Sequence, residues 1–249
     1  MELKILGSGS AGNCYILDNG KEALVIEAGV SFNEVKKAVG FDISRIVGCL
    51  ISHAHGDHAC YYPGFVDNCI HVFTSVGTWD SLRNKEWGRN SYIIDVVSHE
   101  KYQKGNFTFM PFNIQHDAVE PLGFLINHPE TGTILYATDT YYLEYIFEGL
   151  NNILIECNYR LDILEANVSA GSVPKTQRDR TLQSHMSFDT CKETLLANDL
   201  RAVNNIVLIH LSDGNSNAAE FRQSIAEATG KTVHVADKGM VLNFNKTPF

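Results

Sequence analysis

Cysteine is scarce in this chain, and it never occurs in the C-x-x-C spacing of redox or zinc motifs. The sequence has 249 residues and six cysteines, too few for the disulfide framework of a small secreted domain. A chain of this length can also bury enough surface to fold without covalent cross-links. We therefore expect the cysteines to be reduced thiols.

Long apolar runs are missing as well. No stretch reaches the roughly 18–20 apolar residues of a membrane-spanning helix. Residues 1–4 also lack the charged start of a signal peptide that leads into a long apolar stretch. The sequence therefore predicts a cytoplasmic location and no contact with membranes.

Positive charge is in short supply. Lys and Arg together number 20 against 29 Asp and Glu, which leaves a formal net charge of −9. A protein that grips nucleic acid through its overall charge has the opposite sign. Any phosphate-bearing substrate must then be held by a local positive site, such as bound metal ions or a few Arg and Lys side chains.

The rest of the composition is that of an average soluble domain, with 44% apolar and 20% charged residues. Short apolar, β-branched segments indicate strands at residues 3–6, 15–17, 23–26, 46–51, 71–73, 92–97, 107–114, 123–127, 133–137, 153–156, 205–209, 233–235 and 241–244. Helices are predicted over 33–39, 187–197 and 216–229, with Ser187 as an N-cap and Gly230 as a C-terminal stop.

Two sheets covered by helices are the natural layered arrangement for such a pattern of segments. No repeat, low-complexity tract or linker divides the chain, so we expect a single domain over residues 1–249. Residues 159–184 have the least regular pattern and include Gly171 and Pro174. We interpret them as an excursion from the core near the functional site.

Residues 7–12 have the sequence GSGSAG and match the G-x-G-x-x-G spacing of dinucleotide-binding loops. Such loops need a helix at the third glycine, because the helix amides meet the pyrophosphate. Residues 13–17 indicate a strand instead. The segment therefore predicts a tight glycine turn between two strands, which could also line the rim of a site formed elsewhere.

The strongest chemical signal is the H-x-H-x-D-H run formed by His53, His55, Asp57 and His58, directly after an apolar strand. His53 and His55 are two residues apart, so their rings can point the same way in an extended loop. Imidazole and carboxylate at this density suit divalent transition metals such as Zn, Mn or Fe. Four ionisable groups at the end of a buried strand would be costly without a ligand.

This run resembles the signature of the metallo-β-lactamase superfamily. Three later residues resemble further motifs of that family, and each stands at the end of an apolar strand: His116, Asp139 and His210. The resemblance implies an α/β fold, the four-layer αββα sandwich, and two divalent metal ions, with Zn or Mn preferred and Fe possible. The implied ligands are His53, His55 and His116 for one ion, Asp57, His58 and His210 for the second, and Asp139 as the bridge.

A closer resemblance, along the whole chain, is to the YycJ/WalJ-like branch of that superfamily. It is carried by residues 7–14, by His116-Asp117-Ala118, by Glu156-Cys157-Asn158, by Ser184-His185-Met186-Ser187, and by His210-Leu211-Ser212 with Asn215. The branch usually has Asp where this chain has Glu27, and residues 159–183 match loosely. The resemblance implies a phosphodiesterase, specifically a nuclease with DNA as its substrate and nucleic-acid partner.

The implied nucleophile is a hydroxide that bridges the two metal ions, because metal binding lowers the pKa of water towards about 7. We assign Asp57, Asp139 and His185 to catalysis. His185 precedes a predicted helix and would bind a phosphate oxygen or protonate the leaving oxygen, unless it is simply an exposed histidine. Glu27 and Asp117 would accept hydrogen bonds from ligand histidines, although Asp117 could equally be a surface acid.

For substrate binding we single out Asn215 and the local basic cluster of Lys175, Arg178 and Arg180, which could equally be a solvated charged loop. Two other functions stay open. The same metal core could hydrolyse a small phosphodiester, a thioester or a lactam. The protein could also be a partner-binding module with a vestigial metal site, but the intact ligand set argues against that. The sequence leaves the oligomeric state open.

Overall fold

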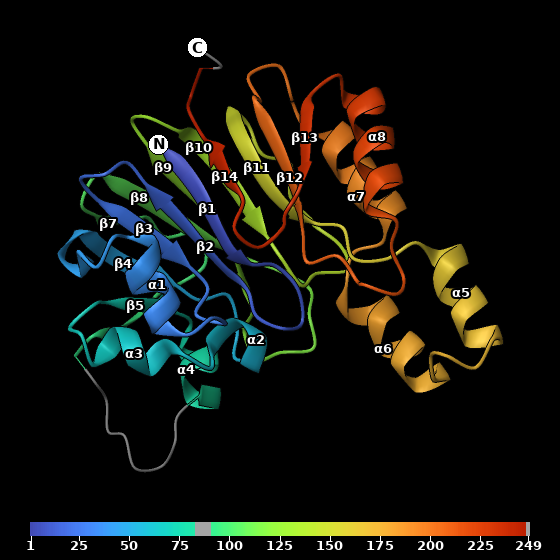
Figure 1. Ribbon diagram of the computed structural model, residues 1–249, viewed down its shortest axis with the longest axis horizontal. Helices are drawn as coiled ribbons and strands as arrows, with labels where there is room; N and C mark the ends of the chain where they lie inside the picture. Colours follow the sequence, from blue (N-terminus) through green and yellow to red (C-terminus); the bar gives the residue numbers. More distant parts are fainter. Residues whose placement is uncertain (83–90, 248–249) are drawn as a thin grey trace.

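The computed structural model describes residues 1–82 and 91–247. Two seven-stranded sheets lie face to face in this part of the chain (Figure 1). The first has the order β14 (Val241–Asn243), β1 (Glu2–Gly7), β2 (Cys14–Asp18), β3 (Ala23–Ile26), β4 (Ile46–Leu50), β5 (Val72–Thr74), β6 (Ile93–Asp95). The second has the order β13 (Thr232–Val235), β12 (Asn205–Ile209), β11 (Leu150–Glu156), β10 (Gly132–Ala137), β9 (Leu122–His128), β8 (Phe107–Asn113), β7 (Tyr102–Lys104).

Successive side chains of a strand point to opposite faces of its sheet, and here both faces are buried. In β2, Tyr15 and Leu17 pack between the sheets, whereas Ile16 packs beneath the outer helices. In β11, Leu154 faces the other sheet and Ile153 faces the helices on the outside. Strands buried on both faces form continuous apolar runs, which is why the sequence predicts them without alternation.

Helices cover the outer face of each sheet (Figure 1). On the side of the first sheet lie α1 (Phe32–Ala38), the 3₁₀ turn η1 (Ile43–Arg45), α2 (Gly56–Ala59), α3 (Tyr62–Val66) and α4 (Val76–Leu82). On the side of the second sheet lie α7 (Phe188–Ala197) and α8 (Ala218–Thr229). The expected four-layer αββα sandwich is therefore confirmed. No described helix is long and apolar enough to cross a membrane.

Local signals placed two helices well. Ser187 caps α7, and its hydroxyl accepts a hydrogen bond from the Thr190 backbone N–H at 3.1 Å. Gly230 ends α8 in the left-handed region with a φ of 65°. The helix α8 begins at Ala218, two residues later than expected, and the Asn217 side chain caps it. The tight turn expected at residues 7–12 connects β1 to β2.

Residues 159–184, whose sequence pattern is the least regular, contain two helices that were not predicted from the sequence. This segment forms α5 (Leu161–Ser169) and α6 (Lys175–Ser184), which extend away from the sheets (Figure 1). Gly171 and Pro174 lie in the connection between them. The sequence of α6, KTQRDRTLQS, is almost entirely polar, so it shows no apolar periodicity by which a helix is recognised.

Candidate metal centre

All of the predicted metal ligands follow the ends of strands. His53 and His55 lie in the chain that leaves β4, and Asp57 and His58 lie in α2, which comes next. The other three follow β8, β10 and β12 of the second sheet: His116, Asp139 and His210. Strands of the two sheets therefore deliver ligands from opposite sides to one place.

Three residues just beyond the strand ends of the site have a left-handed backbone conformation. The φ angles are 66° at Glu27, 48° at Asp139 and 55° at His210. A residue other than glycine pays about 1–3 kcal/mol for a sparsely populated backbone conformation. The surrounding packing must stabilise this conformation, and each of the three side chains takes part in the site.

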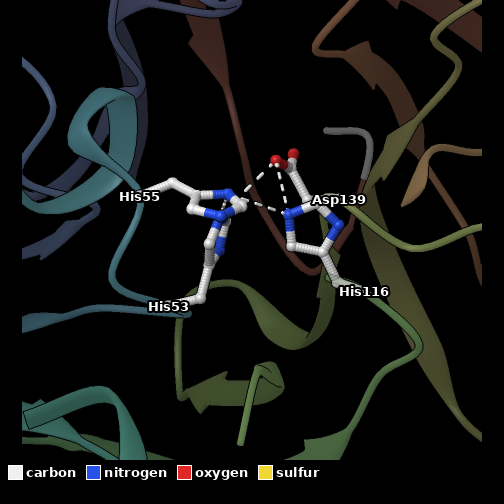
Figure 2. Close-up of side chains that lie close together, drawn as sticks. All are labelled: His53, His55, His116 and Asp139. Atoms are coloured by element: carbon white, nitrogen blue, oxygen red, sulfur yellow. Dashed lines mark hydrogen bonds and ion pairs between the residues drawn. The ribbon is translucent and has the colours of Figure 1, made fainter. Parts of the chain in front are cut away.

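The first ligand group contains His53, His55, His116 and Asp139, whose side chains point toward one another in Figure 2. His55 Nδ1 lies 3.1 Å from His53 Nε2 and 3.1 Å from His116 Nε2. The Asp139 Oδ2 atom lies 3.6 Å from His53 Nε2 and 3.5 Å from His116 Nε2. Three imidazole nitrogens and one carboxylate oxygen thus surround a common point.

The second ligand group contains Asp57, His58, Asp139 and His210. His58 Nε2 lies 3.3 Å from Asp139 Oδ2 and 3.5 Å from Asp57 Oδ2. His210 Nε2 lies 3.4 Å from Asp57 Oδ2. Asp139 belongs to both groups, so its carboxylate stands between two possible cation positions.

The hydrogen bonds around the first group fit a metal. The Ser184 carbonyl oxygen lies 2.9 Å from His116 Nδ1, and it can only accept, so Nδ1 carries the proton. The Nε2 atom of a neutral His116 then presents a lone pair to the nitrogens of His53 and His55. A cation at this point would accept these lone pairs, and a mixed nitrogen and oxygen donor set suits Zn, Mn or Fe.

The charges of the first group fit a metal as well. Burial opposes ionisation of Asp139, but His210 and His58 hold the pKa of this carboxyl well below its ordinary value. Burial lowers the pKa of His53 and His116. The first group thus combines the ionised carboxylate of Asp139 with the neutral imidazoles of His53 and His116, and these are the protonation states that bind metal.

A comparison with known proteins identifies the family. Residues 7–133 match the family described as the metallo-beta-lactamase superfamily. The chain belongs to the metallo-beta-lactamase superfamily. This confirms the predicted family and its assignment to a superfamily of hydrolases, and the fold of that superfamily implies divalent metal ions.

Several metallo-beta-lactamase relatives are similar along most of the chain. The exodeoxyribonuclease WalJ of Streptococcus pneumoniae is 26% identical over 229 residues, which cover 85% of this chain and 82% of the relative. The exodeoxyribonuclease YycJ of Bacillus anthracis is 22% identical over 240 residues, covering 91% and 88%. The crystal structure of YhfI from Bacillus subtilis shares the fold, with 15% identity, a TM-score of 0.73, and coverage of 97% and 99%.

Glu27 and Asp117 occupy different places in this metallo-beta-lactamase site. Glu27 is fully buried, and its Oε2 lies 3.5 Å from His58 Nδ1, which has no closer hydrogen-bond partner. The Tyr136 hydroxyl donates to Glu27 Oε1 at 3.0 Å. Asp117 instead has its Oδ1 atom 3.3 Å from His116 Nε2, on the side that faces the cluster. Its carboxylate therefore does not orient His116 through Nδ1.

Glu156 is a site residue to which the sequence assigned no role. Its carboxylate is fully buried at the end of β11, and Oε1 accepts a hydrogen bond from His185 Nδ1 at 2.7 Å. Its Oε2 accepts the backbone N–H groups of Thr140 and Met186 at 2.9 and 3.1 Å. Burial alone would lower the pKa of His185, but Glu156 raises it overall. In the sequence, the only sign of this role was that Glu156 is an acidic residue at the end of an apolar strand, because its partner His185 is 29 residues away.

A hollow of about 270 Å³ opens in front of the two ligand groups, and we call it the central hollow. Asp57, His185 and His210 line it, together with Arg180 and Asn215 among others. The other two residues of the predicted basic cluster, Lys175 and Arg178, do not line it.

The two arginines of α6 already have partners. The Arg180 Nε atom donates to Asp117 Oδ2 at 2.7 Å. Arg178 forms ion pairs with Glu165 at 2.6 Å and with Asp179 at 2.7 Å. The Glu165 pair joins α6 to α5, so the positive charge of Arg178 is neutralised within the two helices.

Proposed function

We propose that this protein is a metal-dependent phosphodiesterase that uses two divalent metal ions and acts as a nuclease on DNA. Two ligand groups that share Asp139 support this proposal, together with a histidine held by a buried carboxylate on the same hollow. The similar proteins from Streptococcus pneumoniae and Bacillus anthracis are named exodeoxyribonucleases, which favours DNA over other phosphodiesters.

The proposed ligands divide into two sets around one carboxylate. They are His53, His55 and His116 for one ion, Asp57, His58 and His210 for the other, and Asp139 for both. Ions bound there would lower the pKa of water and neutralise the negative charge of a phosphodiester. Zn or Mn, and also Fe, suit this mixture of imidazole and carboxylate ligands. Asp57 and Asp139 thus act in catalysis by holding the ions.

His185 is the proposed proton donor. Hydrolysis breaks the bond between phosphorus and the leaving oxygen, so a hydroxyl group joins phosphorus and the leaving oxygen takes a proton. Glu156 accepts from His185 Nδ1, so the other ring nitrogen, Nε2, is free to hold the proton that is transferred. The ring of His185 stacks on that of His210, with 5.4 Å between the centroids. This packing keeps the proposed donor beside the second ligand group.

Arg180 and Asn215 are the proposed contacts to the substrate phosphate, because both line the central hollow. A phosphate oxygen would compete with Asp117 for the Arg180 guanidinium. Lys175 lies exposed at the start of α6 and would add attraction at longer range. We propose that Arg178, which is already paired, contributes by holding α6 against α5.

The position of Asp139 in both ligand groups is the observation that carries this proposal. The test measures metal content per chain, and then hydrolysis with Mn or Zn of single- and double-stranded DNA, RNA, a cyclic nucleotide, a thioester and a lactam. We expect two metal equivalents and the fastest turnover on DNA. Faster turnover of a thioester or a lactam would reassign the substrate. Fewer than two equivalents with no hydrolysis would favour a partner-binding module.

A further inference from the structure

A second hollow, of about 430 Å³, adjoins the central hollow, and we call it the turn hollow. Its walls are the glycine turn at residues 7–12, the start of α1, and residues 236–238. Ser10 and Leu211 line both hollows, so the two share a border directly beside the metal cluster.

The wall between these hollows is held in place by close contacts. A Cβ atom at Gly12, where φ is 143°, would lie 2.3 Å from the Gly29 carbonyl oxygen, so only glycine permits this approach. The Ser8 hydroxyl accepts a hydrogen bond from the Tyr15 hydroxyl at 2.8 Å and from the His210 backbone N–H at 3.0 Å. The turn hollow thus keeps its position relative to a proposed metal ligand.

The size and the lining of the turn hollow suit one nucleoside. Its volume lies toward the small end of the range of roughly 300–1,000 Å³ for ligand pockets. Hydroxyl groups of Ser10, Ser31 and Tyr61 line it and can meet a sugar or a base. The charged side chains that line it are mainly acidic: Glu34, Asp213 and Asp237 against Lys238. A further phosphate would meet repulsion there. Glu34 is paired with Lys37 at 2.8 Å, so the repulsion comes from Asp213 and Asp237.

A third hollow, which borders the central hollow at Arg180, has a different lining. This third hollow has a volume of about 750 Å³, and Tyr141 and Gln183 also line it. The two carboxylates of this third hollow are paired with arginines, Asp117 with Arg180 and Asp179 with Arg178. This larger space contains a side chain that binds phosphate and an exposed aromatic ring on which a base can stack. A strand that crosses the ligand cluster thus has room to continue into this third hollow.

We propose that the turn hollow receives the terminal nucleoside of a DNA strand, and that its carboxylates exclude a strand that continues beyond it. This inference rests on the proposed nuclease function. It assigns removal of nucleotides from a strand end to Asp213 and Asp237, which lie outside both ligand groups.

The test compares hydrolysis of a linear single-stranded DNA with that of the same sequence closed into a circle, in the presence of Mn or Zn. The wild-type protein should cut the linear strand and spare the circle, which has no terminal nucleoside. The variant D213N/D237N should raise the ratio of circle to linear cleavage by about tenfold or more, because it removes two charges that repel phosphate. The control E193Q/E227Q removes two exposed charges from α7 and α8 and should leave the ratio unchanged.

A second variant fills the hollow. Ala11 is exposed and lines it, so Ala11→Trp should fold, keep its metal, and lose binding of a deoxynucleoside monophosphate measured by calorimetry. The inference would be overturned if D213N/D237N left the cleavage ratio unchanged, or if Ala11→Trp left mononucleotide binding unchanged. In either case, cleavage of linear DNA by the wild-type protein would still support the proposed nuclease function. A wild-type protein that cuts circles as fast as linear DNA would overturn it too. Failure of the wild-type protein to cut linear DNA would overturn the proposed function itself.

Discussion

Replacing Glu156 by Gln tests whether His185 donates a proton during hydrolysis. The buried carboxylate accepts three hydrogen bonds, from His185 Nδ1 at 2.7 Å and from the backbone N–H groups of Thr140 and Met186 at 2.9 and 3.1 Å. Gln has one oxygen for these donors, so its NH₂ group must face one of them. The His185 ring then loses an ionised acceptor and its fixed orientation.

The size of the effect follows from the hydrogen bond that is lost. A hydrogen bond to a charged group contributes about 1.5–3 kcal/mol, which corresponds to roughly a 10- to 150-fold loss of correctly oriented His185. General acid catalysis contributes about 10²–10⁴-fold. Glu156→Gln should therefore slow DNA hydrolysis by about 10- to 150-fold, and His185→Ala by about 10²–10⁴-fold.

The assay compares kcat on linear DNA with kcat on bis(p-nitrophenyl) phosphate, at constant metal content. Nitrophenolate leaves without protonation near neutral pH, so both variants should keep most of their activity on the nitrophenyl ester. An equal loss on the two substrates would refute the reasoning, because a structural defect slows both. Release of metal from His185→Ala would make His185 a ligand and would refute it as well.

Three further outcomes are expected. Asp57→Ala should lose one metal equivalent and DNA hydrolysis while the far-UV circular dichroism stays native, and an active variant would contradict the ligand assignment. Chelation should lower Tm by about 5–10 °C, reversibly on return of Mn or Zn, since a ligand at about 100 times its Kd adds about 2.7 kcal/mol; an unchanged Tm would argue against tight binding. Burial alone would raise the pKa of Asp18, but Lys4 and Arg45 hold it below its ordinary value. The ionised carboxylate of Asp18 therefore stabilises the folded protein above about pH 4, and this stabilisation is lost as pH falls through the lowered pKa. Asp18→Asn should therefore cost about 2 kcal/mol in urea unfolding at pH 7 and progressively less below about pH 4, whereas an equal cost at every pH would exclude the ion pairs as the cause.

Much of the fold was predictable because its signals are local. The buried strands β4, β10 and β12 are short apolar runs, and α7 begins at a serine cap. The polar helix α6 was not predictable in this way. Its formation depends on contacts with other segments, such as the Arg178 pair with Glu165, and on the fit of its last residue, the buried Ser184, beside His116.

The candidate site likewise has a part that was predictable from the sequence and a part that was not. The H-x-H-x-D-H run carries four possible ligands within six residues, so their density alone points to a metal. The partnership of Glu156 with His185 joins a strand end to the residue after α6, and no spacing in the sequence encodes it. The same is true of the turn hollow, whose lining residues come from segments that are far apart in the sequence.

By itself, the sequence determined that the chain forms buried strands with polar residues at their ends, because apolar runs and ligand spacing are properties of neighbouring residues. Only the tertiary structure decided which of those polar residues meet. Glu27, Asp139 and His210 have a left-handed backbone conformation that turns their side chains toward one cluster. This conformation is unfavourable for residues other than glycine, so it forms only where the surrounding packing stabilises it. The physical reason is that burial and long-range hydrogen bonds, which offset this strain, exist only once both sheets have come together.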